Sequence, residues 1–170
     1  MRQIARIILV LSVLCVCLLA DQTTKRMARQ ELAASPGTAV LHGVIGLKYA
    51  ENTGAFQSLG ANMSETVKFW LFTVLVAMLL LALLIHLLTR AQIGNFSLCC
   101  SALILGGGLS NLLDRLQYDG AVIDFLFLSL AGLRSAIFNL ADLCISTGLV
   151  GLLLWHGWRL LRAKTGHARD

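Results

Sequence analysis

The chain has 170 residues, of which 57% are hydrophobic and only 14% are charged, and its formal net charge is +5. Soluble domains carry about 25% charged residues, so this composition excludes an ordinary soluble protein and favours one helical domain in a membrane. The basic residues flank apolar runs and do not alternate with aromatic residues, which argues against a nucleic-acid partner.

The first apolar run extends from Ile4 to Ala20 behind Arg2 and Arg6. Leu14 and Val16 stand before Cys15 and Cys17, where a lipoprotein-type cleavage site has a small residue, and no A-x-A site precedes Asp21, so we interpret the run as a first membrane span. Asp21 and Lys25 follow at a spacing of four, so on a continuing helix they share a face and can form an ion pair. A helix end with simply solvated charges explains them equally well.

Residues 30–66 form the long polar section of the chain. Ser35-Pro36-Gly37 predicts a turn, and the loose alternation from Val40 to Tyr49 predicts a strand. Glu51-Asn52-Thr53-Gly54 predicts a second turn, after which Ala55-Phe56 resumes an extended run. We expect a small β-sheet that lies on the membrane, in which Asn52 is either a turn residue or an amide directed at a site.

Three further apolar runs complete a predicted single domain, 1–170, with spans at 4–21, 67–88, 96–113 and 139–161. The third span contains Gly106, Gly107 and Gly108, which permit close helix contact. Four spans place both termini on one side, and the basic C-terminal cluster predicts that this side is the cytoplasm. Segments 22–66 and 114–138 would then be extracytoplasmic, and the five cysteines, all within apolar runs, would be unpaired.

Two acids lie inside apolar sequence, Asp124 in VIDFLFL and Asp142 in FNLADLCI. An ionised carboxylate is costly there, so each is a candidate functional residue. Two neighbouring carboxylates tend to share one proton, and such a pair can activate water against an amide carbonyl. Asp142 also has a purely structural explanation, because acids are favoured in the first turn of a helix.

A metal site is the alternative use of the acids Asp114, Asp119 and Asp124. Their five-residue spacing fits neither one helix face nor a known oxygen-ligand loop, so we expect no metal and no cofactor. The polar residues that the predicted topology brings to the outer membrane face are Asp21, Asn52, Asn111, Asp114, Arg115, Asp124, Asn139 and Asp142.

Five ordered blocks of this sequence resemble the bacterial lipoprotein signal peptidases, also called prolipoprotein signal peptidase or signal peptidase II. The blocks are D-Q-x-T-K (Asp21 to Lys25), E-N-T-G-A-F (Glu51 to Phe56), G-G-x-L-x-N-L-x-D-R (Gly106 to Arg115), V-I-D-F (Val122 to Phe125) and F-N-L-A-D (Phe138 to Asp142). Each block alone is a weak signal, but together they span about three quarters of the chain in the family's order and spacing.

The resemblance implies a four-helix aspartyl endopeptidase of the bacterial inner membrane, and by default we expect it to be a monomer surrounded by membrane lipid. Its substrates would be prolipoproteins, cut on the N-terminal side of a cysteine that carries diacylglycerol, near the outer face. The residues would divide into a catalytic pair (Asp124 and Asp142), site support or substrate contacts (Asn52, Gly54, Asn111, Arg115 and Asn139) and a structural pair (Asp21 and Lys25).

Two departures from the family pattern bear on substrate fit. Ser110 stands where the family usually has glycine, and residues 134–137 lack the aromatic that often precedes the last block. Two other functions therefore stay open: a diverged paralogue that does not process precursors, and a small transporter that uses the same acids as a proton relay. The chain shows no internal repeat of the kind that transporters usually carry.

Overall fold

The computed structural model describes residues 3–40, 44–54, 60, 62–90, 92–130 and 133–166. Within these residues, four helices are long and apolar enough to cross a membrane. They are α1 (Gln3–Leu32), a continuous run of α2 (Glu65–Lys68), the π-helical η2 (Phe69–Val74) and α3 (Leu75–Thr89), then α4 (Asn95–Gln117) and α5 (Leu140–Gly166). The prediction of a membrane protein with four spanning helices is therefore confirmed.

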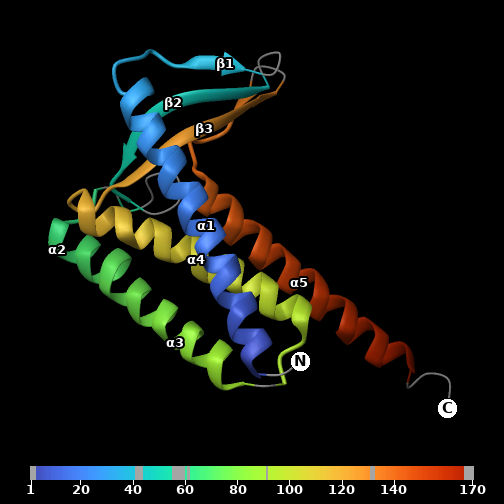
Figure 1. The fold of residues 1–170 in the computed structure, drawn as a ribbon. Helices are drawn as coiled ribbons and strands as arrows, with labels where there is room; N and C mark the ends of the chain where they lie inside the picture. The colour runs from blue at the N-terminus through green and yellow to red at the C-terminus, as the bar shows by residue number, and fades with distance from the viewer. Residues whose placement is uncertain are drawn as a thin grey trace.

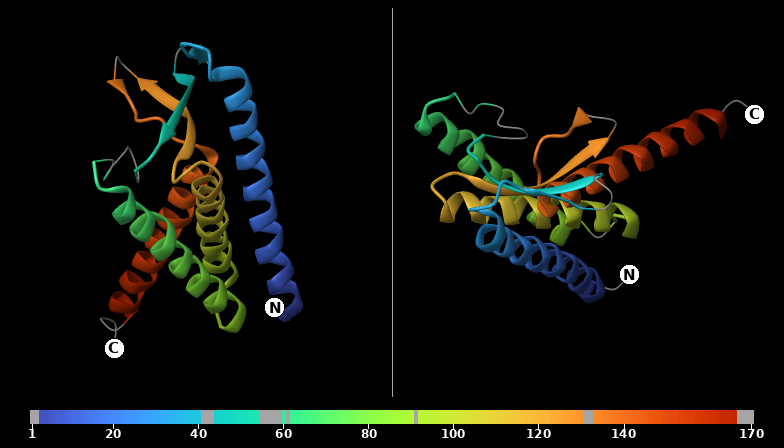
Figure 2. Two further views of the ribbon diagram at one scale, coloured as in Figure 1. Left: turned by 90° about the vertical axis from the view of Figure 1, so that its left-hand side faces the viewer. Right: turned by 90° about the horizontal axis from the view of Figure 1, so that it is seen from above.

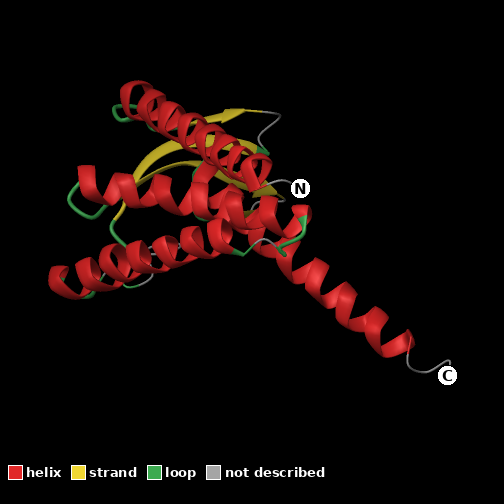
Figure 3. Ribbon diagram, turned by 60° about the horizontal axis from the view of Figure 1, so that its bottom comes forward, coloured by secondary structure: helices red, strands yellow, loops and turns green. Residues whose placement is uncertain are grey.

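The helices extend from one end of the molecule, and a small sheet covers the other end (Figure 1). Both termini lie at the end away from the sheet, and the C-terminal half of α5 runs away from the other helices (Figures 1 and 3). A narrow apolar core, which includes Val10, Leu87, Leu98 and Leu105, joins α1, α3 and α4. Many large apolar side chains face outward instead, as expected for helices whose solvent is lipid.

The sheet is antiparallel, with the strand order β1 (Thr38–Val40), β2 (Ile45–Asn52), β3 (Val122–Leu130) and β4 (Leu133–Arg134). Figure 2 shows the sheet at one end of the helices, where β2, which precedes α2, pairs antiparallel with β3, which follows α4. The register pairs Ala50 with Asp124 and Asn52 with Val122. The predicted small sheet is confirmed, and it brings the end of β2 to the start of β3.

The three consecutive glycines of α4 each contact a different helix. A Cβ at Gly106 would lie 2.8 Å from Cys17 Cβ of α1, and a Cβ at Gly108 would lie 2.6 Å from Leu80 Cδ2 of α3. A Cβ at Gly107 would overlap the backbone carbonyl of Ala141 in α5. The close helix contact expected from the glycine run is present, and it makes α4 the centre of the bundle.

The bounds of some elements differ from those expected. Helix α1 continues to Leu32 although the apolar run ends at Ala20, because Asp21 and Lys25 pair across one helical turn and remain buried. Strand β2 extends to Asn52, so the bend that follows it falls at Gly54. The run expected at 55–56 lies outside the described residues. Residues 118–120 form a turn, with positive φ at Asp119 (49°) and Gly120 (88°).

Candidate active site

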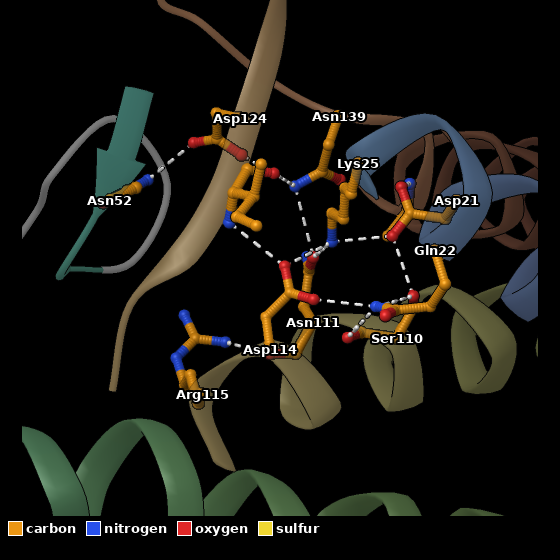
Figure 4. A network of polar contacts seen from close by, with 12 residues as sticks. Asp21, Gln22, Lys25, Asn52, Ser110, Asn111, Asp114, Arg115, Asp124 and Asn139 are labelled. Atoms are coloured by element: carbon orange, nitrogen blue, oxygen red, sulfur yellow. Dashed lines mark hydrogen bonds and ion pairs between the residues drawn. The ribbon is translucent and has the colours of Figure 1, made fainter. Parts of the chain in front are cut away.

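Asp124 is on β3 with only 3% of its surface exposed, and two asparagine amides hold its carboxylate. Asn52 Nδ2 donates to Asp124 Oδ2 at 3.1 Å, and Asn139 Nδ2 donates to Asp124 Oδ1 at 2.7 Å (Figure 4). Burial raises the pKa of Asp124 to about 6, and the charge of Asp142 adds to this, while the two amides lower it. Asp124 therefore titrates far above an ordinary aspartate.

Asp142 is in the first turn of α5, where it forms a reciprocal pair with Asn139. The backbone N–H of Asp142 donates to Asn139 Oδ1 at 2.9 Å, and the backbone N–H of Asn139 donates to Asp142 Oδ2 at 3.2 Å. This is the arrangement of a capping box, which satisfies amides that the helix leaves unpaired. Asn111 Nδ2 donates to the remaining oxygen, Asp142 Oδ1, at 2.9 Å.

A buried ionic cluster lies beside this pair, where α1, α4 and β3 meet (Figure 4). Lys25 Nζ lies 2.6 Å from Asp21 Oδ2 and 2.8 Å from Asp114 Oδ2, and all three side chains are at most 1% exposed. Asp21 Oδ1 accepts the backbone N–H of Ala141, and Asp114 Oδ2 accepts that of Ile123. The cluster therefore fixes the start of α5 and the start of β3, the two segments that carry Asp142 and Asp124.

Sequence reasoning missed three members of this cluster. It placed Asp114 on the outer membrane face without predicting a buried ion pair, although the residue is fully buried, and it assigned no site role to Gln22 or Ser110. Gln22 Nε2 donates to Asp114 Oδ1 at 2.7 Å and to Ser110 Oγ at 3.0 Å, and Ser110 Oγ donates to Asp21 Oδ2 at 2.7 Å. The serine that departs from the family pattern was the available signal, because a polar residue amid glycines in a span needs a partner.

Arg115 and Gly54 close the site on its other side. Arg115 Nη2 donates to the carbonyl oxygen of Gly54 at 3.1 Å, and Nη1 donates to that of Asn111 at 3.3 Å. The N–H of Gly54 donates to Asn52 Oδ1 at 3.0 Å, which orients the amide that Asn52 presents to Asp124. The structure thus brings together every residue that the sequence placed at the site, while Asp119 stays exposed in its turn.

Both acids line one cavity of about 490 Å³. Its polar part is formed by Asn52, Asn111, Arg115, Asp124 and Asp142. Its apolar part is formed by Val76, Val122, Leu128, Ile137, Phe138, Leu143 and Ile145. Two carboxylates of which one titrates near neutrality can serve as base and acid on a substrate in this space. Among the described residues, no three His, Cys, Asp or Glu side chains are placed to hold a metal ion.

Comparison with known sequences gives a consistent result. The family model described as signal peptidase (SPase) II matches residues 13–158. A lipoprotein signal peptidase of Sphingopyxis alaskensis is 37% identical over 155 residues, which cover 90% of this chain and 86% of the relative. One from Syntrophotalea carbinolica is 34% identical over 154 residues, covering 91% and 92% of the two chains.

Solved structures share the fold. A bacterial membrane enzyme solved by the in meso method at 2.3 Å resolution superposes with a TM-score of 0.73 at 23% identity, covering 98% of this chain and 93% of that one. A second bacterial membrane enzyme, solved at 1.9 Å, gives a TM-score of 0.69 at 23% identity, covering 88% and 90%. Four helices with a small sheet at one end are therefore a known membrane-enzyme architecture.

Proposed function

Because this chain belongs to the signal peptidase II family, and is therefore a membrane peptidase that cleaves signal peptides, we propose that it does so with an aspartate pair, Asp124 and Asp142. One observation carries the proposal: two buried acids from distant segments line a single cavity, and all four of their carboxylate oxygens accept an N–H donor. Donors at every oxygen hold both carboxylates in one geometry, as an acid–base pair requires.

The two acids have different surroundings, and these assign their roles. Asp142 is at the N-terminus of α5, where the helix dipole and a backbone N–H favour the ionised form. Asp124 is more deeply buried on β3, and its pKa is raised to about 6. In our proposal Asp142 is the base and Asp124 carries the shared proton, with the titration belonging to the pair as a whole.

The reaction then proceeds without a covalent intermediate. Asp142 takes a proton from water as the water oxygen attacks the scissile carbonyl carbon, and Asp124 gives its proton to the carbonyl oxygen. As the tetrahedral intermediate collapses, Asp142 gives its proton to the amide nitrogen, Asp124 takes a proton back from a hydroxyl of the intermediate, and the C–N bond breaks, so that the pair again holds one proton. One product is the carboxyl end of the signal peptide, and the other is a new amino terminus.

The substrate class follows from the relatives, which are named lipoprotein signal peptidases. We propose that the bond cut precedes a cysteine carrying diacylglycerol. The cavity supports this assignment because its apolar wall can take acyl chains while its polar end, with Arg115, meets the peptide. The site would then lie at the outer membrane face and both termini in the cytoplasm, since the sheet and the termini are at opposite ends (Figure 1).

A proton relay is a weaker use of the same acids. A relay needs polar groups that continue across the membrane, whereas the described residues below the pair, such as Leu80, Leu98, Ala102 and Leu105, form an apolar core. Proton transfer through such a core has no donors or acceptors to follow.

The test is cleavage of a diacylglyceryl-modified precursor by purified protein in detergent or vesicles. Asp124→Asn and Asp142→Asn keep the side-chain shape but remove the acid, so each is expected to lower kcat by about 10⁴-fold, as loss of a group that works as part of a catalytic unit does. Asp119→Asn is the matched control, because this acid is exposed in a turn and Asn tolerates its positive φ. Cleavage by either site variant at the parent rate would exclude the aspartate pair.

A further inference from the structure

The ammonium group of Lys25 has a third contact in addition to its two ion pairs. It lies 2.6 Å from Asp21 Oδ2 and 2.8 Å from Asp114 Oδ2, and it donates to Asn111 Oδ1 at 2.8 Å. An ammonium has three N–H donors, so these three oxygens use them all. The contact to Asn111 connects the ionic cluster to the site, because the same amide donates to Asp142.

Lys25 determines which end of the Asn111 amide faces Asp142. An ammonium only donates hydrogen bonds, so the oxygen of the amide must face Lys25 and its NH₂ group must face the carboxylate at 2.9 Å. The flipped amide would set NH₂ against a cation and oxygen against an anion, which makes two repulsive contacts. Asn139 Nδ2, which donates to Asn111 Oδ1 at 3.2 Å, reinforces the observed orientation.

The contacts that anchor the helices are separable from this one. Asp21 holds the start of α5 through Ala141 N–H and holds α4 through Ser110 Oγ. An asparagine at position 21 can keep its single oxygen toward the Ala141 N–H, while its NH₂ group faces Ser110 Oγ, a hydroxyl that can accept as well as donate. The cation can therefore be removed while the packing of α1 is kept. A variant of this kind distinguishes a structural role of Lys25 from a role in the reaction.

We infer that Lys25 is a positioning residue for cleavage: through Asn111 it fixes the hydrogen bond to Asp142 and, as a buried cation, it favours the ionised form of the pair. The inference rests on the proposed function and deepens it. The charged groups that face the pair are Lys25 and Asp21 from α1 and Arg115 from α4, and Asp114 of α4 contacts Lys25. Lys25 also favours the ionised form of Asp124, because burial raises the pKa of Asp124 and the charge of Lys25 lowers it.

The experiment compares Asp21→Asn/Lys25→Met with Asp21→Asn alone, both as full-length protein in detergent. The double variant removes one negative and one positive charge, so the net charge of the cluster does not change. We expect kcat to fall at least about tenfold with little change in KM, since only the geometry of a reacting group is disturbed. The pH below which kcat falls on the acid side is expected to rise by about one unit, the usual effect of losing a nearby opposite charge. Asp21→Asn alone is expected to move this pH in the opposite direction, down, because the negative charge of Asp21 opposes ionisation of the pair.

Two further measurements separate the possible failures. Melting of each variant in detergent reports the structural contribution, and titration of the aspartate carboxyl ¹³C signals reports the pair whether or not a precursor is cleaved. If the double variant does not fold, Asp21→Asn/Lys25→Gln keeps a polar side chain without the cation and is expected to move the titration in the same direction. A parent protein that never cleaves would refute the proposed function alone. An unchanged pair titration, or an equal shift in Asp21→Asn, would overturn the role of Lys25.

Discussion

The contact between Gly107 and α5 can be used to test how precisely Asp142 must be positioned for activity. Gly107 is one helical turn before Asn111, and it packs against the first turn of α5, which carries Asp142. A methyl group at this position would overlap the Ala141 carbonyl oxygen and lie 2.9 Å from Ile145 Cγ1. Backbone cannot rotate away as a flexible side chain can, so Gly107→Ala has to separate the two helices.

The size of the separation follows from the contact distances. Ordinary van der Waals contact of a Cβ begins at 3.4 Å, so the 2.9 Å approach to Ile145 alone requires about 0.5 Å of movement. If that movement is along the hydrogen bond from Asn111 to Asp142, the 2.9 Å bond opens to about 3.4 Å, near the limit for such bonds. Misplacing a reacting group by 1 Å costs about 100-fold in rate, so we expect a loss of about 10- to 100-fold in kcat.

The assay is precursor cleavage at saturating substrate, with melting in detergent measured on the same samples. Gly148→Ala is the matched control for crowding, because its methyl would meet the Cys100 carbonyl of the same helix pair, farther along α5 from Asp142. Both variants are expected to lose about 1–3 kcal/mol of stability through overpacking, but only Gly107→Ala should lose most of its rate. Gly157→Ala, which meets nothing within 4 Å, should resemble the parent. Equal rate losses in Gly107→Ala and Gly148→Ala would refute the geometric argument.

Three other outcomes are expected. Asn52→Ala removes a hydrogen bond that lowers the pKa of Asp124, so the pKa of Asp124 rises above about 6. Because Asp124 must be protonated to act as the acid, the pH at which kcat/KM falls on the alkaline side should rise by about half a unit to one unit. If that pH is unchanged or falls, Asp124 is not the acid. Ser110→Ala leaves Asp21 Oδ2 without its hydroxyl donor and should lower the free energy of unfolding by about 1–3 kcal/mol; an unchanged melting temperature in detergent would mean that water replaces the hydroxyl without cost. A chelator should leave cleavage unchanged, and a loss that added divalent cation restores would overturn the metal-free mechanism.

The helices were predictable because apolar length alone identifies a span in a protein of this composition. The exact end of α1 was not, because charges at Asp21 and Lys25 are typical of a helix that leaves the membrane. Their burial depends on Asp114, which is distant in sequence, and a sequence pattern does not contain that contact. The turn predicted at residues 51–54 began two residues too early for a similar reason, since pairing with β3 extends β2 to Asn52.

Part of the site could be read from residue type and surroundings. Asp124 and Asp142 could be identified because an ionised carboxylate is costly in apolar sequence. The asparagines beside them were assigned from the family resemblance. The identity of each hydrogen bond could not be inferred, because it depends on rotamers in a three-helix junction. Gln22 illustrates this: nothing in its neighbourhood in the sequence indicates that it reaches Asp114 and Ser110.

The buried Lys25 cluster has a consequence for how the protein enters its membrane. Asp21 and Lys25 are four residues apart on α1, so they can neutralise each other as soon as that helix forms. Their third partner, Asp114, belongs to α4, and the amide that Asp21 caps belongs to α5, so both arrive only after later segments are inserted. The protease would therefore stay inactive during its own biogenesis, and it would gain the ability to cut a chain only when its final helix docks.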